Sequence, residues 1–357
     1  MTNPAETPAA PKPRAIVEQL PRYSQSAAAG VVRWRASSNE SPFPPSPEVV
    51  AAVSEAAARA NRYPSLFGDL LAVDIAERLG VSRAQVVTGG GSISLLQQTL
   101  LSYVEPGQEV VIPWRSYEAY PILIGVAGAK QVRVPLAADH THDLEAMLAA
   151  ITPDTAAVVV CTPNNPTGTE VAADRLADFL DRVPPTVLVL LDEAYCEFGD
   201  AARSIDVPAL LQRHANLAVF RTFSKAYGLA GVRAGYMISS EEIAENVRTA
   251  SPPFGLSLTS EAAARAAWAD TAHLDATVTA VRASRARLRE ALVGLGYDVP
   301  VSGANFVWVP APDTLALEAA CADEGVSVRA FPGEGVRITV GEQGAEKAVL
   351  RALGTLR

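Results

Sequence analysis

The chain has 357 residues, of which 49% are hydrophobic, so it is long enough for two domains with a sizeable core and too apolar for a disordered protein. Its formal net charge of −9 argues against nucleic acid as a main partner, and no apolar run approaches the twenty residues of a membrane span. Three widely spaced cysteines, Cys161, Cys196 and Cys321, fit reduced thiols in a cytoplasmic protein.

The N-terminal residues predict a tail and an arm ahead of the main fold. Residues 1–14 are rich in proline and alanine and lack the apolar stretch of an export signal, so we expect a flexible tail. Residues 15–45 are expected to form an arm that joins a small C-terminal domain, and residues 46–270 to form a large domain.

A glycine-rich stretch follows the short apolar run at 85–87. Gly90 and Gly91 precede Ser92, and a helical apolar pattern continues to residue 104. Backbone N–H groups at the N-terminus of a helix suit an anion, so the stretch predicts a phosphate cradle. Three glycines alone are more often an ordinary loop.

Short apolar runs separated by helical patterns predict an α/β fold with a mostly parallel sheet covered on both faces. These runs cover residues 109–113, 157–163, 186–192 and 216–224. One Ala/Arg-rich helix is expected over 261–292 as a link. Strands near 305–310, 326–330 and 336–340 then predict a small α/β domain within residues 271–357.

Asp192 ends a run of branched apolar residues, which places it where α/β sheets bind ligands. A carboxylate there can keep a pyridine nitrogen protonated, although aspartate is also a common helix cap. Tyr195 and Asn165 could hydrogen-bond a phenolic oxygen on the same ring. Each also fits a structural role, as a core tyrosine and as a turn asparagine before proline.

Lys225 lies between Ser224 and Arg233 in the stretch RTFSKAYGLAGVRAGY. A lysine forms a Schiff base when its surroundings lower its pKa, and arginine grips phosphate through paired hydrogen bonds. Carboxylate, phenol, amide, hydroxyl, lysine and arginine together match what pyridoxal phosphate requires. His140 and His142 have no third ligand at useful spacing, so we predict a solvated loop there and no metal site.

These residues resemble the fold-type I pyridoxal-phosphate aminotransferases, and within them the histidinol-phosphate and aromatic (phenylalanine) branch. The resemblance runs from about Tyr23 to the C-terminus. It rests on PNNPTG at 163–168, DEAY at 192–195, SKAYGLAGVRAGY at 224–236, NRYP at 61–64, PWRSYEAY at 113–120 and VRITVG at 336–341. It implies a seven-stranded, mostly parallel sheet in the large domain and a homodimer with shared active sites.

The resemblance also implies roles for individual residues. Lys225 resembles the Schiff-base lysine, Asp192 the pyridine partner, and Tyr195 and Asn165 the contacts to the phenolic oxygen. The other cofactor contacts that it implies are Gly90, Gly91, Ser92, Ser224 and Arg233 at the phosphate, Tyr117 on the ring, and Tyr63 from the neighbouring subunit. The implied substrate contacts are Tyr23, Asn39, Arg329 and Arg337, the last for an α-carboxylate or for the phosphate of histidinol phosphate.

Departures from the histidinol-phosphate pattern favour an apolar or aromatic side chain over a phosphorylated one. They include SQSAAAG after Tyr23, where some members carry basic residues, and a short loop between Arg329 and Arg337. Gly90-Gly91-Ser92 replaces a small residue followed by Asp-Glu, and Arg115-Ser116 replaces Pro-Thr ahead of the stacking tyrosine. We therefore expect amino transfer between a phenylalanine-like amino acid and 2-oxoglutarate by a ping-pong mechanism. Histidinol-phosphate transamination is the nearest alternative.

Two further alternatives use the same scaffold. One is a decarboxylase similar to relatives that act on phosphorylated threonine, and production of a keto acid would exclude it. The other is a non-catalytic ligand sensor, but about forty residues before the main domain carry no helix-turn-helix pattern.

Overall fold

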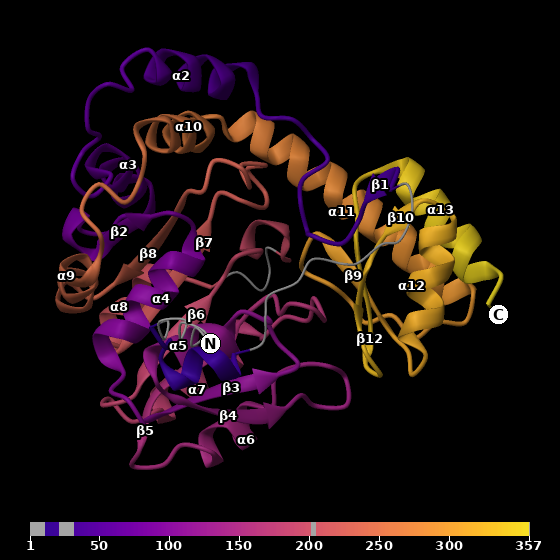
Figure 1. Ribbon diagram of the computed structural model, residues 1–357, viewed down its shortest axis with the longest axis horizontal. Helices are drawn as coiled ribbons and strands as arrows, with labels where there is room; N and C mark the ends of the chain where they lie inside the picture. The colour runs from indigo at the N-terminus through magenta and orange to yellow at the C-terminus, as the bar shows by residue number, and fades with distance from the viewer. Residues whose placement is uncertain (1–10, 21–31, 201–204, 357) are drawn as a thin grey trace, which may run out of the picture.

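The computed structural model describes residues 11–20, 32–200 and 205–356, and its largest feature is a seven-stranded sheet (Figure 1). The strand order is β2-β8-β7-β6-β5-β3-β4. Strand β8 runs antiparallel to both of its neighbours, and every other pair is parallel. The strands are β2 (Val86–Gly89), β3 (Glu109–Trp114), β4 (Lys130–Pro135), β5 (Thr155–Cys161), β6 (Leu188–Asp192), β7 (Leu217–Thr222) and β8 (Gly235–Ser239).

Helices cover both faces of this sheet, which explains why apolar residues occupy successive positions in its central strands. In β6, Leu188 and Leu190 pack into one core, and Val189 and Leu191 pack into the core on the opposite face. The first core is closed by α4 (Ser92–Tyr103), α5 (Tyr120–Ala127) and α9 (Glu241–Ala250). The second is closed by α2 (Pro47–Ala57), α3 (Asp69–Leu79), α6 (Leu144–Ala149), α7 (Ala173–Arg182), α8 (Val207–Arg213) and α10 (Leu258–Ala269).

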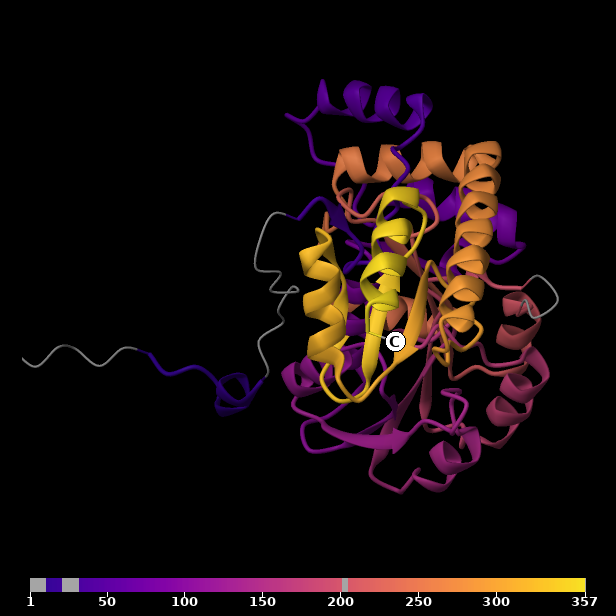
Figure 2. The same cartoon turned by 90° about the vertical axis from the view of Figure 1, so that its right-hand side faces the viewer.

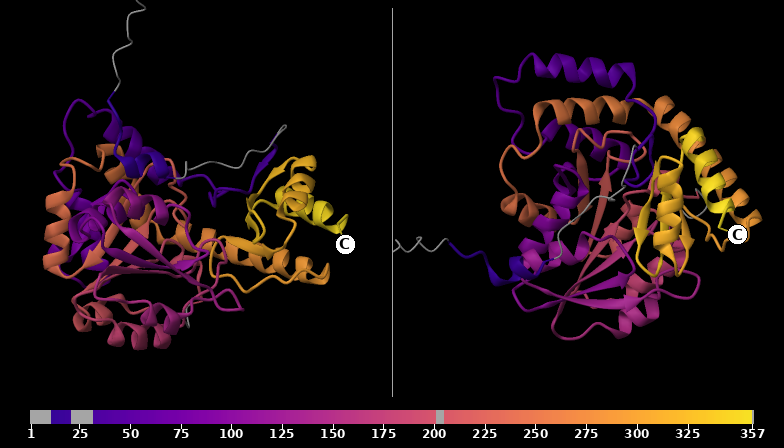
Figure 3. Two further views of the ribbon diagram at one scale, coloured as in Figure 1. Left: turned by 60° about the horizontal axis from the view of Figure 1, so that its bottom comes forward. Right: turned by 45° about the vertical axis from the view of Figure 1, so that its right-hand side comes forward.

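The C-terminal part builds a third core around a three-stranded antiparallel sheet in the order β11-β12-β9 (Figure 2). Its elements are α11 (Thr271–Gly294), β9 (Phe306–Pro310), α12 (Thr314–Asp323), β11 (Arg329–Phe331), β12 (Gly335–Thr339) and α13 (Gln343–Gly354). Near the other end of the chain, β1 (Trp34–Arg35) pairs in parallel with β10 (Val326–Ser327). Figure 3 shows this C-terminal part to one side of the large sheet.

The single helix expected over 261–292 is wrong, because the structure divides it into α10 and α11 at Asp270. The backbone of Asp270 leaves the helical region, and its side chain accepts a hydrogen bond of 3.0 Å from the backbone N–H of His273. Asp270 therefore caps α11, a role that aspartate commonly fills. The strand expected at 326–330 is likewise divided, since β10 and β11 pair in different sheets.

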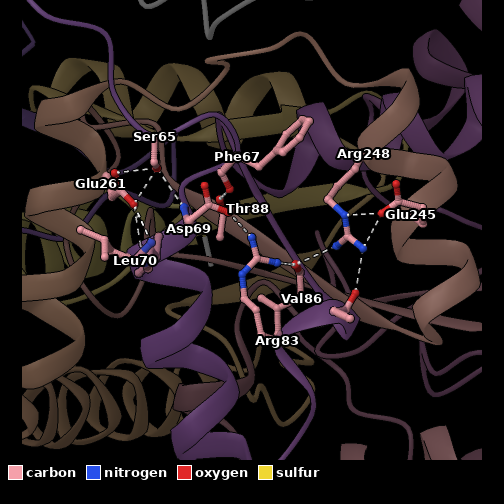
Figure 4. Close-up of polar contacts among 12 residues, drawn as sticks. Ser65, Phe67, Asp69, Leu70, Arg83, Val86, Thr88, Glu245, Arg248 and Glu261 are labelled. Atoms are coloured by element: carbon pink, nitrogen blue, oxygen red, sulfur yellow. Dashed lines mark hydrogen bonds and ion pairs between the residues drawn. The ribbon is translucent and has the colours of Figure 1, made fainter.

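The segment that leads from Tyr63 into α3 is anchored to the large sheet by polar contacts (Figure 4). Glu261 of α10 accepts hydrogen bonds from the Ser65 hydroxyl at 3.1 Å and from the Leu70 backbone N–H at 3.1 Å. The Thr88 hydroxyl of β2 donates to the Phe67 carbonyl at 2.7 Å. These bonds give the start of α3 a defined position beside the sheet.

The remaining elements are short. Helix α1 (Ala15–Gln19) contacts α5, and the 3₁₀ turns are η1 (Arg83–Gln85) and η2 (Cys196–Phe198). Tyr23 and residues 1–10 of the expected tail lie outside the described residues. Within the described part of the chain, no helix is both long and apolar enough to cross a membrane.

Candidate active site

A cavity of about 250 Å³ opens at the carboxyl ends of the central strands. Asp192 is the last residue of β6 and Thr222 the last of β7, and both line the cavity. The arm before α2, the start of α4 and the strands β11 and β12 complete its walls. Eleven residues named from the sequence line it: Asn39, Ser92, Tyr117, Asn165, Asp192, Tyr195, Ser224, Lys225, Arg233, Arg329 and Arg337.

Lys225 lies in the turn that follows β7, and its amine points toward the N-terminal arm. Its Nζ donates to the carbonyl of Asn39 at 3.1 Å and to that of Ser38 at 3.4 Å. Desolvation lowers the pKa of Lys225 to about 8, and the positive charge of Arg337 adds to the effect. A larger share of this amine is therefore neutral and nucleophilic than in an ordinary lysine.

Asp192 is a buried carboxylate with a defined orientation. It accepts hydrogen bonds from the Tyr120 hydroxyl at 2.7 Å and from the Ala194 backbone N–H at 3.1 Å. Burial raises the pKa of Asp192 to about 6, and the bond from Tyr120 opposes the rise. Asp192 is therefore an anion at neutral pH that would gain from a cationic partner in the cavity. Tyr120 lies in the segment 113–120 that carries the resemblance, but no local pattern predicts its contact with Asp192.

Hydroxyl and guanidinium groups gather at the start of α4. Arg233 donates from Nη1 to the Ser224 hydroxyl at 3.2 Å and from Nη2 to the Gly90 carbonyl at 3.4 Å. The hydroxyl of Thr222, a residue that no sequence pattern predicted for the site, donates to the Ser224 hydroxyl at 3.0 Å. Gly91 has a φ of 89°, and a Cβ at that position would lie 2.6 Å from Arg233 Nη2. The glycine thus leaves this cationic cradle open beside the helix N-terminus, a suitable place for an anion.

Asn39 links the N-terminal arm to the rest of the cavity. It is buried with a φ of 55°, and its Nδ2 donates to the Tyr195 hydroxyl at 2.9 Å. Its backbone N–H donates to the Thr339 hydroxyl at 3.0 Å. Across the cavity, Arg337 Nη1 donates to Asn165 Oδ1 at 2.6 Å. Asn39 therefore ties the arm to Tyr195, and Arg337 ties the small sheet to Asn165.

Arg329 lines the cavity and forms an ion pair with Glu118. Its Nε donates to Glu118 Oε2 at 3.1 Å, and its Nη2 lies 2.9 Å from each oxygen of the same carboxylate. Glu118 also lines the cavity, next to Tyr117. It was not singled out from the sequence, although it lies in the segment 113–120 that carried the resemblance.

The other residues named from the sequence lie elsewhere. Gly90 and Gly91 are outside the cavity lining, although the Gly90 carbonyl contacts Arg233. Tyr63 is 80% exposed, lies away from this cavity, and stacks on Phe254 with ring centroids 4.6 Å apart. Tyr23 is outside the described residues.

Comparisons with known proteins agree with this geometry. A family model described as "Aminotransferase class I and II" matches residues 35–355. The chain is 46% identical over 345 residues to an aromatic amino acid aminotransferase of Streptomyces coelicolor, an alignment that covers 96% of each protein. It is 48% identical over 306 residues to an aromatic amino acid aminotransferase of Thermobifida fusca, over 85% of each. A solved structure of histidinol-phosphate aminotransferase from Sinorhizobium meliloti in complex with pyridoxal-5′-phosphate is similar, with a TM-score of 0.89, 30% identity and 98% of both chains covered.

Proposed function

The chain belongs to the class I and II aminotransferases, and from this premise we propose that it moves an amino group between a phenylalanine-like amino acid and 2-oxoglutarate. Its cofactor is pyridoxal 5′-phosphate, and its kinetics are ping-pong because one site handles both half-reactions. The observation that carries the proposal is that Lys225 and Asp192, with pKa values displaced in opposite directions, face one cavity.

The residues of the cavity fit this cofactor by their chemistry. The buried carboxylate of Asp192 suits a ring N–H, and the amine of Lys225 suits an aldehyde. Ser92, Ser224 and Arg233 offer hydroxyls and a guanidinium for the phosphate. Gly91 leaves room for that guanidinium, because a Cβ there would lie 2.6 Å from Arg233 Nη2. Tyr195 and Asn165 would donate to the phenolic oxygen, and Tyr117 would lie against the ring.

When bound, pyridoxal phosphate supplies an aldehyde that takes up the amino group and a ring that accepts the electron pair left at the substrate Cα. Lys225 Nζ removes the Cα proton as general base. Asp192 would hold the proton on the ring nitrogen, and the bond from Tyr120 orients the carboxylate for that contact. Arg337 receives the substrate α-carboxylate by paired hydrogen bonds.

An aromatic substrate is favoured by the relatives that share 41 to 48% identity with most of this chain and carry the name aromatic amino acid aminotransferase. The histidinol-phosphate aminotransferase with a TM-score of 0.89 supports the alternative. The test is a single-turnover absorbance trace of cofactor-loaded enzyme mixed separately with phenylalanine and with histidinol phosphate. A rapid change with phenylalanine alone is the expected result, and the reverse pattern would assign the alternative.

A homodimer with shared sites and a cytoplasmic location complete the proposal. Tyr63 supports the dimer, because its side chain is exposed and lies away from the cavity of its own subunit. The segment that follows Tyr63 is anchored to the sheet, so the exposed ring has a defined position from which it could reach a neighbouring subunit. The location is supported by Cys161, Cys196 and Cys321, which are all free thiols.

A further inference from the structure

Two arginines face each other on neighbouring strands of the small sheet. Arg329 in β11 and Arg337 in β12 are register partners in an antiparallel pair. Side chains of such partners lie on the same face about 5 Å apart at Cβ, where like charges repel. Both arginines line the cavity. Left alone, this pair would form a site for two anionic groups.

Glu118 changes that charge balance. It comes from the segment between β3 and α5, and both of its carboxylate oxygens lie within hydrogen-bond distance of Arg329. The pair is mostly shielded, with side-chain exposures of 15% for Arg329 and 31% for Glu118. Partial burial makes such a bidentate pair stronger than a surface ion pair.

The charged side chains that line the cavity fall into two groups, those that fit the cofactor and those left for the substrate. Asp192, Lys225 and Arg233 are the groups that fit the cofactor. Within residues 11–20, 32–200 and 205–356, the rest of the charged lining consists of Arg329, Arg337 and Glu118, with a formal charge of +1. That charge matches a substrate with one carboxylate and no second anion.

We propose that Glu118 is a specificity-determining residue, which occupies Arg329 and thereby favours substrates with an α-carboxylate and an uncharged side chain over substrates with a second anionic group. The proposal rests on the proposed function and defines its substrate class. A phosphate monoester, or the second carboxylate of 2-oxoglutarate, must compete with Glu118 for Arg329. Such ligands therefore bind with a penalty that an aromatic amino acid does not incur.

The test compares two unreactive acids as ligands of the cofactor-loaded enzyme by isothermal titration calorimetry. Glutarate has two carboxylates, whereas 3-phenylpropionate has one carboxylate and a phenyl ring. The quantity compared is the ratio of the dissociation constant of glutarate to that of 3-phenylpropionate. In Glu118→Gln this ratio is expected to fall by about tenfold or more relative to the parent, because a hydrogen bond to a charged group usually contributes that much. The double variant Glu118→Gln/Arg329→Gln should lose that gain.

The chain offers a matched control in a second ion pair between the same two parts of the molecule. Glu334, in the turn between β11 and β12, accepts from Arg115 Nε at 2.9 Å, and neither residue lines the cavity. Glu334→Gln should therefore leave the ratio of the two dissociation constants unchanged. An equal gain in this control would overturn the proposal, because loosening of the contact would then explain it.

Two other results would also overturn the assignment of Glu118. One is a Glu118→Gln variant whose ratio equals that of the parent, and the other is a gain that persists without Arg329. Turnover of phenylalanine by the parent enzyme is measured separately. If the parent fails to turn over phenylalanine but Glu118→Gln still shifts the ratio, the proposed substrate is refuted. The role of Glu118 then stands.

Discussion

Asp192→Asn tests the electrostatic argument most directly. Asparagine keeps the size of the side chain. Its Oδ1 can still accept from the Ala194 N–H, which lies 3.1 Å from Asp192 Oδ1, and its Nδ2 can donate to the Tyr120 hydroxyl oxygen, which lies 2.7 Å from Asp192 Oδ2. The fold should therefore survive. What is lost is a negative charge in a side chain that is only 4% exposed.

The size of the kinetic effect follows from Coulomb's law. Opposite charges about 4 Å apart, at the effective dielectric constant of about 20 that suits protein sites, attract by about 4 kcal/mol. If the protonated ring loses that stabilisation, proton removal from the substrate slows by about a thousandfold. Stopped-flow absorbance in a single turnover with phenylalanine measures this step. A rate within about fivefold of the parent would show that the ring charge does not depend on Asp192.

The same substitution should slow catalysis but stabilise the cofactor-free protein against unfolding. Burial raises the pKa of Asp192 from 3.8 to about 6, so the folded protein holds this proton to higher pH than the unfolded chain does. Asp192 therefore destabilises the fold above pH 6 by about 3 kcal/mol, and by almost nothing below pH 4. In urea unfolding of the cofactor-free proteins, Asp192→Asn should therefore raise the free energy of unfolding at pH 8, and the difference from the parent should disappear toward pH 4.

Lys225→Ala should abolish turnover of phenylalanine while circular dichroism shows an intact fold, and turnover at the parent rate would exclude Lys225 as the catalytic amine. Gly91→Ala places a Cβ 2.6 Å from Arg233 Nη2, so a fluorescence titration of the cofactor-free enzyme should show an affinity for pyridoxal phosphate at least about tenfold lower. Gly80→Ala is its control, because Gly80 also has a positive φ but no atom within 4 Å of the added Cβ. Tyr63→Ala should weaken cofactor binding while sedimentation still shows a dimer, and unchanged cofactor affinity would contradict the shared site.

Local patterns were sufficient to predict the fold class and many of the cavity residues. A buried parallel strand is apolar throughout and ends at the edge of the sheet where ligands bind, so the position of Asp192 follows from the residues before it. Lys225 and Ser224 follow the next strand in the sheet, and the three residues reach one cavity because β6 and β7 are parallel neighbours. The family and its cofactor were confirmed by comparisons over nearly the whole chain.

The contacts that tune these groups depend on residues far apart in the chain, and no local pattern encodes them. Tyr120 reaches Asp192 across 72 positions, and Glu118 reaches Arg329 across 211. Asn39 has a left-handed backbone conformation, which asparagine tolerates, and its partners there lie 156 and 300 positions away. Such contacts arise only when two cores, the arm and the small sheet pack around one cavity. Residue types and their order therefore predict the available chemistry, whereas tertiary packing decides which charges are paired.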